Sequence, residues 1–130
     1  MGEQANAKVL VVDDSASMRA VVSSIVKKMG FSVIGEAANG KEAVVVALRD
    51  EPDIVMLDIN MPIKTGFEAL QEIKADHPTA VVIMMTSVSD METVEKCIEA
   101  GAAGYVLKSA THEEIAKSID DAWEAGKAWQ

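Results

Sequence analysis

The sequence predicts an α/β domain built on a doubly wound sheet of five parallel strands. Five short apolar runs alternate along the chain with segments whose apolar residues recur at helical spacing. A run that is apolar at consecutive positions is typical of a strand buried on both faces of a parallel sheet. The connections are short, and right-handed crossovers between parallel strands place helices on both faces of one sheet. The length of 130 residues is that of a single compact domain.

The first two strand–helix units follow from apolar spacing and turn residues. Residues 9–12 are all apolar and stop at a pair of aspartates, which predicts a buried strand. Gly30 stands where the C-terminal cap of the next helix favours glycine. Residues 31–34 predict the second strand, and Asn39-Gly40 leads into a helix that ends at Pro52. The first helix has its apolar stripe at Met18, Val21, Val22, Ile25, Val26 and Met29.

The third and fourth units repeat this pattern. Residues 53–57 and 80–85 predict strands three and four. The third helix stops before Pro78, because the residue before a proline disfavours helical backbone. Gly101 occupies the cap position of the fourth helix. The apolar stripes of these helices are Phe67, Leu70 and Ile73 in the third, and Met91, Val94, Cys97 and Ile98 in the fourth.

The fifth unit completes one domain. Residues 105–107 predict a short strand, and the last helix is striped by Ile115, Ile119, Ala122 and Trp123. The sequence has no internal repeat, linker or low-complexity segment. We therefore expect a single domain over residues 1–130, in which residues 1–7 form an N-terminal tail.

Composition excludes several classes of protein. Twelve basic against 21 acidic residues give a formal net charge of −9, which repels phosphate backbones and argues against direct nucleic-acid binding. The single cysteine, Cys97, cannot form an internal disulfide, which is typical of a reducing compartment. No apolar run is long enough to cross a membrane, and no signal peptide is visible. A cytoplasmic protein without membrane insertion is expected.

Four of the five predicted strands end at a residue with functional chemistry. Strand one ends at Asp13-Asp14, strand three at Asp58, strand four at Thr86 and strand five at Lys108. In a doubly wound sheet the ligand site lies outside the carboxyl ends of the strands. These side chains should therefore meet on one rim of the molecule.

Their combined chemistry favours phosphoryl transfer. Carboxylates 4 Å apart repel by ~4 kcal/mol per pair at an effective dielectric of 20, and a hard cation such as Mg²⁺ relieves that repulsion. Lys108 would supply a positive charge and Thr86 a hydroxyl donor. Such groups aimed at one carboxylate suit it to act as the nucleophile toward phosphorus. Taken singly, each residue also has an ordinary reading as a helix cap, a loop residue or a solvated lysine, and only their joint position favours a site.

Three short segments and one threonine at the predicted strand ends resemble the motifs of a known family. The segments 11–15 (Val-Val-Asp-Asp-Ser), 58–62 (Asp-Ile-Asn-Met-Pro) and 104–108 (Gly-Tyr-Val-Leu-Lys), with Thr86, are similar to the receiver domain of response regulators. The resemblance covers the chain from Lys8 to about Trp123. It implies a flavodoxin-like fold with strand order 2-1-3-4-5, and single-domain chemotaxis regulators are the most similar branch.

The resemblance implies a two-component phosphorelay role for the acidic residues. Asp58 would accept the phosphoryl group from a phosphohistidine on a sensor kinase or a phosphotransfer protein. Asp14 would bind Mg²⁺ directly and Asp13 through water. Asp58 itself and the backbone carbonyl of Asn60 would be further ligands. The protein would then catalyse only its own phosphorylation and dephosphorylation, and it would not be an enzyme with an external substrate.

The resemblance also implies how the signal leaves the site. Lys108 would pair with the phosphoryl oxygens, Thr86 would turn to hydrogen-bond them, and Tyr105 would move between cleft and solvent. The surface of helix four (about 90–100), strand five and helix five (about 111–124) would bind a downstream protein, or a second receiver in a homodimer of the phosphorylated form.

Three alternatives remain at the level of the sequence. Ser109 follows Lys108 where the family usually has proline, which makes a trans peptide bond the expectation and resembles receivers joined to a helix-turn-helix domain. The chain is then either a stand-alone regulator or a receiver fragment of a larger DNA-binding regulator. A pseudo-receiver that is never phosphorylated is the second alternative. The third alternative is an aspartyl phosphatase. Such an enzyme requires a carboxylic acid two residues after the nucleophile, and this sequence has Asn60 at that position, which argues against it.

Overall fold

The fold is a five-stranded parallel sheet with helices on both faces, as predicted. The computed structural model describes residues 7–127. The strand order is β2-β1-β3-β4-β5, which confirms the flavodoxin-like arrangement. The elements are β1 (Lys8–Val12), α1 (Ala16–Lys28), β2 (Ser32–Ala37), α2 (Gly40–Asp50), β3 (Ile54–Asp58), α3 (Gly66–Asp76), β4 (Val81–Thr86), a 3-10 turn (Val88–Asp90), α4 (Met91–Glu99), β5 (Gly104–Leu107) and α5 (His112–Lys127).

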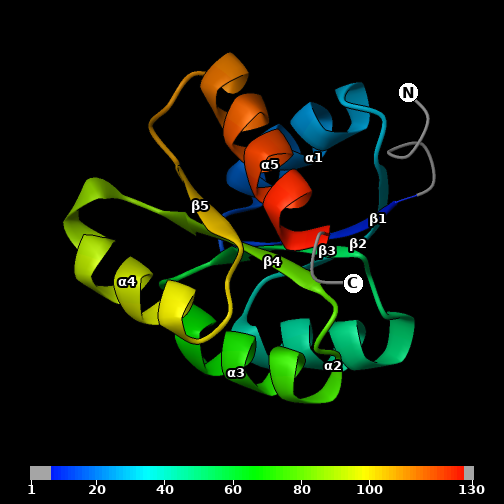
Figure 1. Ribbon diagram of the computed structural model, residues 1–130, viewed down its shortest axis with the longest axis vertical. Coiled ribbons are helices and arrows are strands. Elements are labelled where there is room, and N and C mark those ends of the chain that lie inside the picture. The colour runs from blue at the N-terminus through cyan, green and yellow to red at the C-terminus, as the bar shows by residue number, and fades with distance from the viewer. Residues whose placement is uncertain (1–6, 128–130) are drawn as a thin grey trace.

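Two apolar cores lie on opposite faces of the sheet. Helices α1 and α5 cover one face, and α2, α3 and α4 cover the other (Figure 1). Successive residues of a strand point to opposite faces, so each central strand serves both cores. In β3, for example, Val55 and Leu57 pack toward α2, α3 and α4, whereas Ile54 and Met56 pack toward α1 and α5. All five residues of β3 are buried, which explains their unbroken apolar run up to Asp58.

The second strand differs from its prediction. The apolar run suggested residues 31–34, but β2 begins at Ser32 and continues to Ala37. It is an edge strand paired only with β1, and five of its six residues are exposed or only partly buried. Because one side of an edge strand is open to solvent, β2 can include Gly35 and Glu36. These residues are not apolar, so the apolar pattern in the sequence did not reveal that the strand continues through them. Phe31 is buried just before the strand.

Two further details correct the sequence-based picture of burial. Ile98, assigned to the apolar stripe of the fourth helix, is 43% exposed and lies at the solvent edge of α4. Ala7, assigned to the N-terminal tail, is buried in the core beneath α1 and α5; residues 1–6 of that tail lie outside the described part of the chain. All peptide bonds among residues 7–127 are trans, which includes the bond between Lys108 and Ser109. Among these residues no helix has the length and apolarity to cross a membrane.

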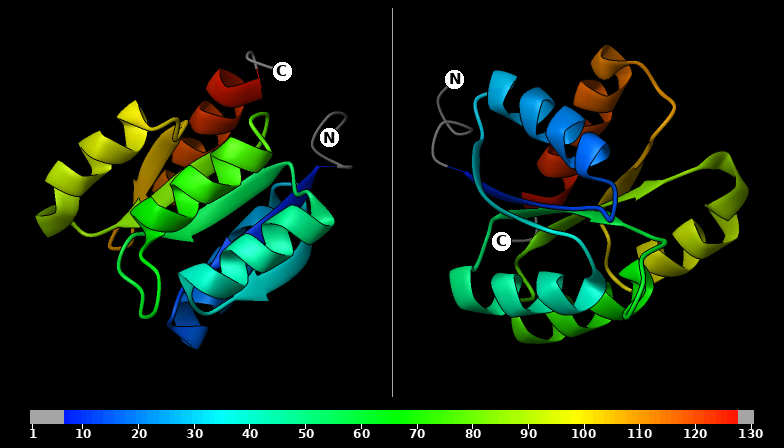
Figure 2. Two further views of the ribbon diagram at one scale, coloured as in Figure 1. Left: turned by 90° about the horizontal axis from the view of Figure 1, so that it is seen from below. Right: turned by 180° about the vertical axis from the view of Figure 1, so that it is seen from behind.

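The register of the sheet places the strand ends side by side. Val12 pairs with Leu57, Asp58 with Met85, and Thr86 with Leu107. The residues that follow or close these strands therefore reach the same edge. The two views in Figure 2 show the helices flanking the sheet and the loop that leaves β3 projecting from it.

Candidate functional site

The site begins with three carboxylates at the ends of β1 and β3. One ligand oxygen from each of Asp13, Asp14 and Asp58 lies within 4.8 Å of the others. Asp13 is fully buried and Asp58 is 2% exposed, whereas Asp14 is open to solvent. Sequence reasoning placed these residues on one rim, and the structure brings them together. Three hard oxygen donors at this separation fit a small divalent cation such as Mg²⁺.

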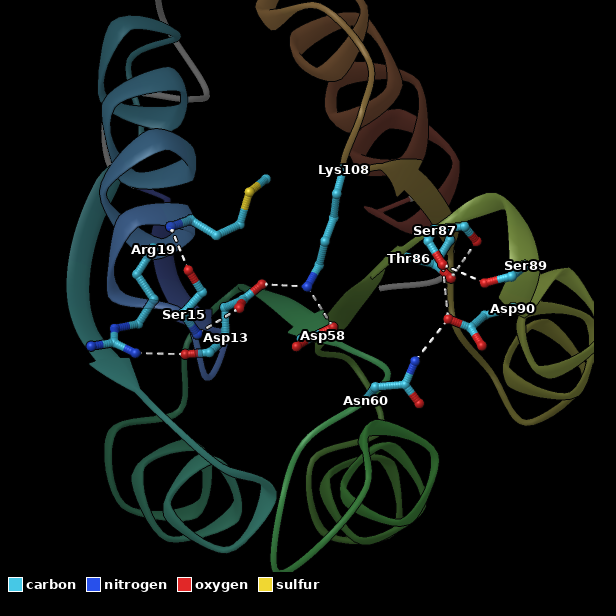
Figure 3. Close-up of polar contacts among 11 residues, drawn as sticks. Asp13, Ser15, Arg19, Asp58, Asn60, Thr86, Ser87, Ser89, Asp90 and Lys108 are labelled. Atoms are coloured by element: carbon cyan, nitrogen blue, oxygen red, sulfur yellow. Dashed lines mark hydrogen bonds and ion pairs between the residues drawn. The ribbon is translucent and has the colours of Figure 1, made fainter.

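Lys108 balances part of this negative charge from the end of β5. Its ammonium Nζ lies 2.9 Å from Asp13 Oδ2 and 2.9 Å from Asp58 Oδ1. Figure 3 shows Lys108 reaching between the two carboxylates. The other oxygen of Asp13 accepts a hydrogen bond from the backbone N–H of Ser15, at 2.9 Å. The second oxygen of Asp58, Oδ2, is buried and has no hydrogen-bond partner within the described structure. A buried carboxylate oxygen without a hydrogen-bond partner is costly, and a cation bound there would offset that cost.

The protonation of Asp58 reflects this environment. Burial raises the pKa of its carboxyl from 3.8 to about 6, and the neighbouring charge of Asp13 adds to the rise. The hydrogen bond and positive charge of Lys108, together with the backbone N–H of Asn60, oppose it. For Lys108, burial acts to lower the pKa, but the hydrogen bonds to Asp13 and Asp58 outweigh it and the pKa is raised. At neutral pH Lys108 is therefore charged, and most of Asp58 is ionised and able to act as a nucleophile.

The loop after β3 is held tightly against the acceptor. The backbone N–H of Gly66 donates to the carbonyl of Ile59 at 2.8 Å, which closes the loop onto the strand. A Cβ at Gly66 would collide with the carbonyl oxygen of Asp58, so a side chain there is incompatible with this loop. Ile59 and Met61 anchor the loop in the core, while Asn60 between them stays exposed. The requirement for glycine at the start of α3 is thus a requirement of the acceptor loop.

Thr86 and Tyr105 lie on adjacent strands beside the acceptor. Thr86 is 1% exposed, and its hydroxyl donates to the backbone carbonyl of Ser87 at 3.1 Å rather than to Asp58. Tyr105 is 38% exposed, so its ring faces the solvent side of β5 in this structure. It lines an open groove of about 810 Å³ between β5 and α5, together with Lys117 and Asp121. The predicted output surface is therefore hollowed beside Tyr105.

Two sets of contacts were not found by sequence reasoning. Arg19, noted only as part of a motif, donates to the backbone carbonyl of Asp13 at 2.6 Å and pairs with Glu36. Across the rim, the Asp90 carboxylate accepts hydrogen bonds from Asn60 and from Ser87 (Figure 3). Arg19 and Glu36 are 17 residues apart in sequence, and Asn60 and Asp90 are 30 apart, so no local periodicity marks these contacts.

Comparisons with known proteins agree with this geometry. The family described as the response regulator receiver domain matches residues 9–120. The chemotaxis protein CheY of Halobacterium salinarum is 41% identical over 114 residues, which cover 88% of this chain and 94% of that protein. The transcriptional regulatory protein YdfI of Bacillus subtilis is 40% identical over 116 residues, but these cover only 54% of its length.

Solved structures give the same result. The crystal structure of the response regulator domain of Thermotoga maritima CheB has a TM-score of 0.82 and 32% identity, and the match covers 94% of this chain and 96% of that one. The chemotaxis protein CheY4 of Vibrio cholerae has a TM-score of 0.81 and 32% identity, with 91% and 99% covered. Fold, acidic rim and sequence similarity together show that the chain belongs to the response regulator receiver domain family of two-component signalling.

Proposed function

We propose that this receiver is a phosphoacceptor and that Asp58 takes the phosphoryl group. The observation that carries the proposal is the state of its carboxylate. One oxygen is held by Lys108, and the other is buried without a partner at the edge of the acidic cluster. An ionised carboxylate that is oriented by a lysine through one oxygen, and whose other oxygen contacts no side chain, can attack phosphorus.

The transfer would proceed by direct attack. An Asp58 oxygen forms a bond to phosphorus while the bond from phosphorus to the nitrogen of a donor phosphohistidine breaks, and the imidazole leaves. An ionised carboxylate needs no general base for this step. Lys108, already 2.9 Å from Asp58, would pair with the phosphoryl oxygens. Asp13, Asp14, Asp58 and the backbone carbonyl of Asn60 would hold Mg²⁺, which supplies charge neutralisation for the transferred group.

The same geometry supports a switch protein rather than an enzyme with an external substrate. Asn60 stands where an aspartyl phosphatase would need a carboxylic acid for its leaving group, and its side chain donates to Asp90. The phosphoryl group would therefore stay on Asp58 until water removes it. Meanwhile Thr86 would turn from the Ser87 carbonyl toward the phosphoryl oxygens, and Tyr105 would follow into the space that Thr86 leaves.

The partners follow from this role. The donor is a sensor histidine kinase or a phosphotransfer protein, and the similarity to chemotaxis proteins CheY suggests a chemotaxis pathway in the cytoplasm. The target is a protein that binds the surface of α4, β5 and α5, or a second phosphorylated receiver on the same surface. The comparisons do not favour the alternatives of a fragment of a DNA-binding regulator or a pseudo-receiver.

Incubation with acetyl phosphate and Mg²⁺, followed by intact-mass measurement, tests the proposal. The expected result is an increase by one phosphoryl group, lost in Asp58→Asn and kept in the control Asp76→Asn, whose carboxylate is exposed on α3. No adduct in the wild-type protein would indicate a pseudo-receiver. Continuous turnover of phosphate ester without a lasting adduct would indicate a phosphatase.

A further inference from the structure

The first turn of α4 lacks the cap that the other helices have. Ser15, Asn39 and Thr65 cap α1, α2 and α3 through their side-chain oxygens, and Thr111 accepts from the backbone N–H of Glu114 at the start of α5. Asp90 stands at the corresponding position of α4, and aspartate is among the best capping residues. Its side chain nevertheless makes no capping hydrogen bond.

The Asp90 carboxylate is instead held on the acceptor side. Its Oδ2 accepts from the amide Nδ2 of Asn60 at 2.7 Å and from the hydroxyl of Ser87 at 3.1 Å (Figure 3). The backbone agrees with this arrangement. Capping residues of α1, α2 and α3 are extended, with ψ between 117° and 169°, whereas Asp90 has ψ of 20° and closes the 3-10 turn of residues 88–90. In this geometry the Asp90 carboxylate accepts no hydrogen bond from the free backbone N–H groups of α4.

Both routes from the acceptor reach Asp90. Asn60 is two residues from Asp58 on the acceptor loop and donates directly to Asp90. On the other side, the carbonyl of Ser87 accepts the hydroxyl of Thr86 and the backbone N–H of Asp90, each at 3.1 Å. If Thr86 leaves that carbonyl, the carbonyl that anchors the 3-10 turn keeps only the hydrogen bond from the Asp90 N–H. A phosphoryl group on Asp58 also adds negative charge to the rim that holds the Asp90 carboxylate.

We propose that Asp90 is a two-position coupling residue: it binds Asn60 and Ser87 in the unphosphorylated protein, and it caps α4 when Asp58 is phosphorylated. In the second position the 3-10 turn opens, the backbone of Asp90 becomes extended, and its carboxylate accepts the N–H groups of Glu92 and Thr93. The exchange is balanced, because the Asn60 amide that is released is exposed and can bond to water. It ties the stability of the first turn of α4 to the state of the acceptor. The inference rests on the proposed acceptor role of Asp58.

Amide hydrogen exchange by NMR, with and without beryllofluoride and Mg²⁺, measures the cap directly. A new cap should increase the protection of the Thr93 N–H by roughly five- to tenfold. Asp90→Ala should abolish this increase, while Asp90→Asn, whose amide oxygen can also cap, should retain most of it. Asp76→Asn is the matched control, because it changes an exposed aspartate of α3 in the same way as Asp90→Asn.

A second variant tests the other position. Asn60→Ala removes one donor that holds Asp90, so Thr93 should gain protection even without beryllofluoride. The inference is overturned if Asp90→Ala retains the wild-type increase, if Asn60→Ala leaves Thr93 unchanged, or if wild-type signals shift around Asp58 but not at Thr93. If beryllofluoride shifts no signal near Asp58, the proposed acceptor role fails, and the coupling fails with it.

Discussion

Replacing Asp58 by asparagine should stabilise the protein in the absence of magnesium while it removes the acceptor. Burial and the neighbouring Asp13 make the ionised form of Asp58 unfavourable, as its pKa of about 6 shows. The difference from the ordinary 3.8 corresponds to a cost of about 3 kcal/mol above pH 6. Asparagine keeps the shape and carries no charge. We expect a gain of roughly 1–3 kcal/mol, which raises the thermal unfolding midpoint by about 3–15 °C for a chain of this size.

The pH dependence of this gain identifies its cause. The folded-state pKa of Asp58 is raised above that of the unfolded chain, so between about pH 4 and pH 6 the folded protein binds a proton that the unfolded protein has released. The contribution of Asp58 to the free energy of unfolding of the wild-type protein therefore falls as the pH rises from about 4 to 6. Above pH 6 the decrease is complete. The difference between Asp58→Asn and wild type should be near zero at pH 4 and reach a plateau above pH 6.

Urea unfolding in EDTA at several pH values between 4 and 8 provides the measurement. Asp76→Asn, on the exposed surface of α3, is the control and should not reproduce the step. Added Mg²⁺ should narrow the gap, because it binds the folded wild-type protein and stabilises it. A gain of equal size at pH 4 and pH 7, or no gain at either, would refute the argument from buried charge.

Three other perturbations probe separate parts of the site. The increase in unfolding midpoint on adding Mg²⁺ should shrink more in Asp14→Ala than in Asp13→Ala, because Asp14 is the assigned direct ligand; equal and negligible changes would contradict that geometry. Gly66→Ala should destabilise the protein by about 1–3 kcal/mol in urea unfolding, because the added Cβ meets the carbonyl of the acceptor residue, and an unchanged midpoint would show that the loop relaxes. The NMR signals of the Tyr105 ring should shift with beryllofluoride and Mg²⁺ in the wild type but not in Thr86→Ala, and identical shifts in both proteins would exclude Thr86 as the carrier of the signal.

Much of the fold could be predicted because the central strands are buried on both faces. Continuous apolar runs such as residues 9–12 and 80–85 have few alternatives to a strand in a parallel sheet, and their polar ends identify the rim. The edge strand β2 was predicted less well, since its partly exposed residues carry a weak apolar signal. Ile98 shows the same limit, because an apolar residue at helical spacing need not face the core.

The identity of the charged residues at the rim was determined by the sequence, and their interactions were decided by tertiary structure. Asp58 and Lys108 could be placed on one edge from strand order alone, but burial and the register of β1, β3, β4 and β5 decide that Lys108 holds one oxygen of Asp58 and leaves the other free. The contact between Asn60 and Asp90 joins two loops 30 residues apart. No local pattern encodes such a contact, because it depends on how adjacent loops pack once the sheet has formed.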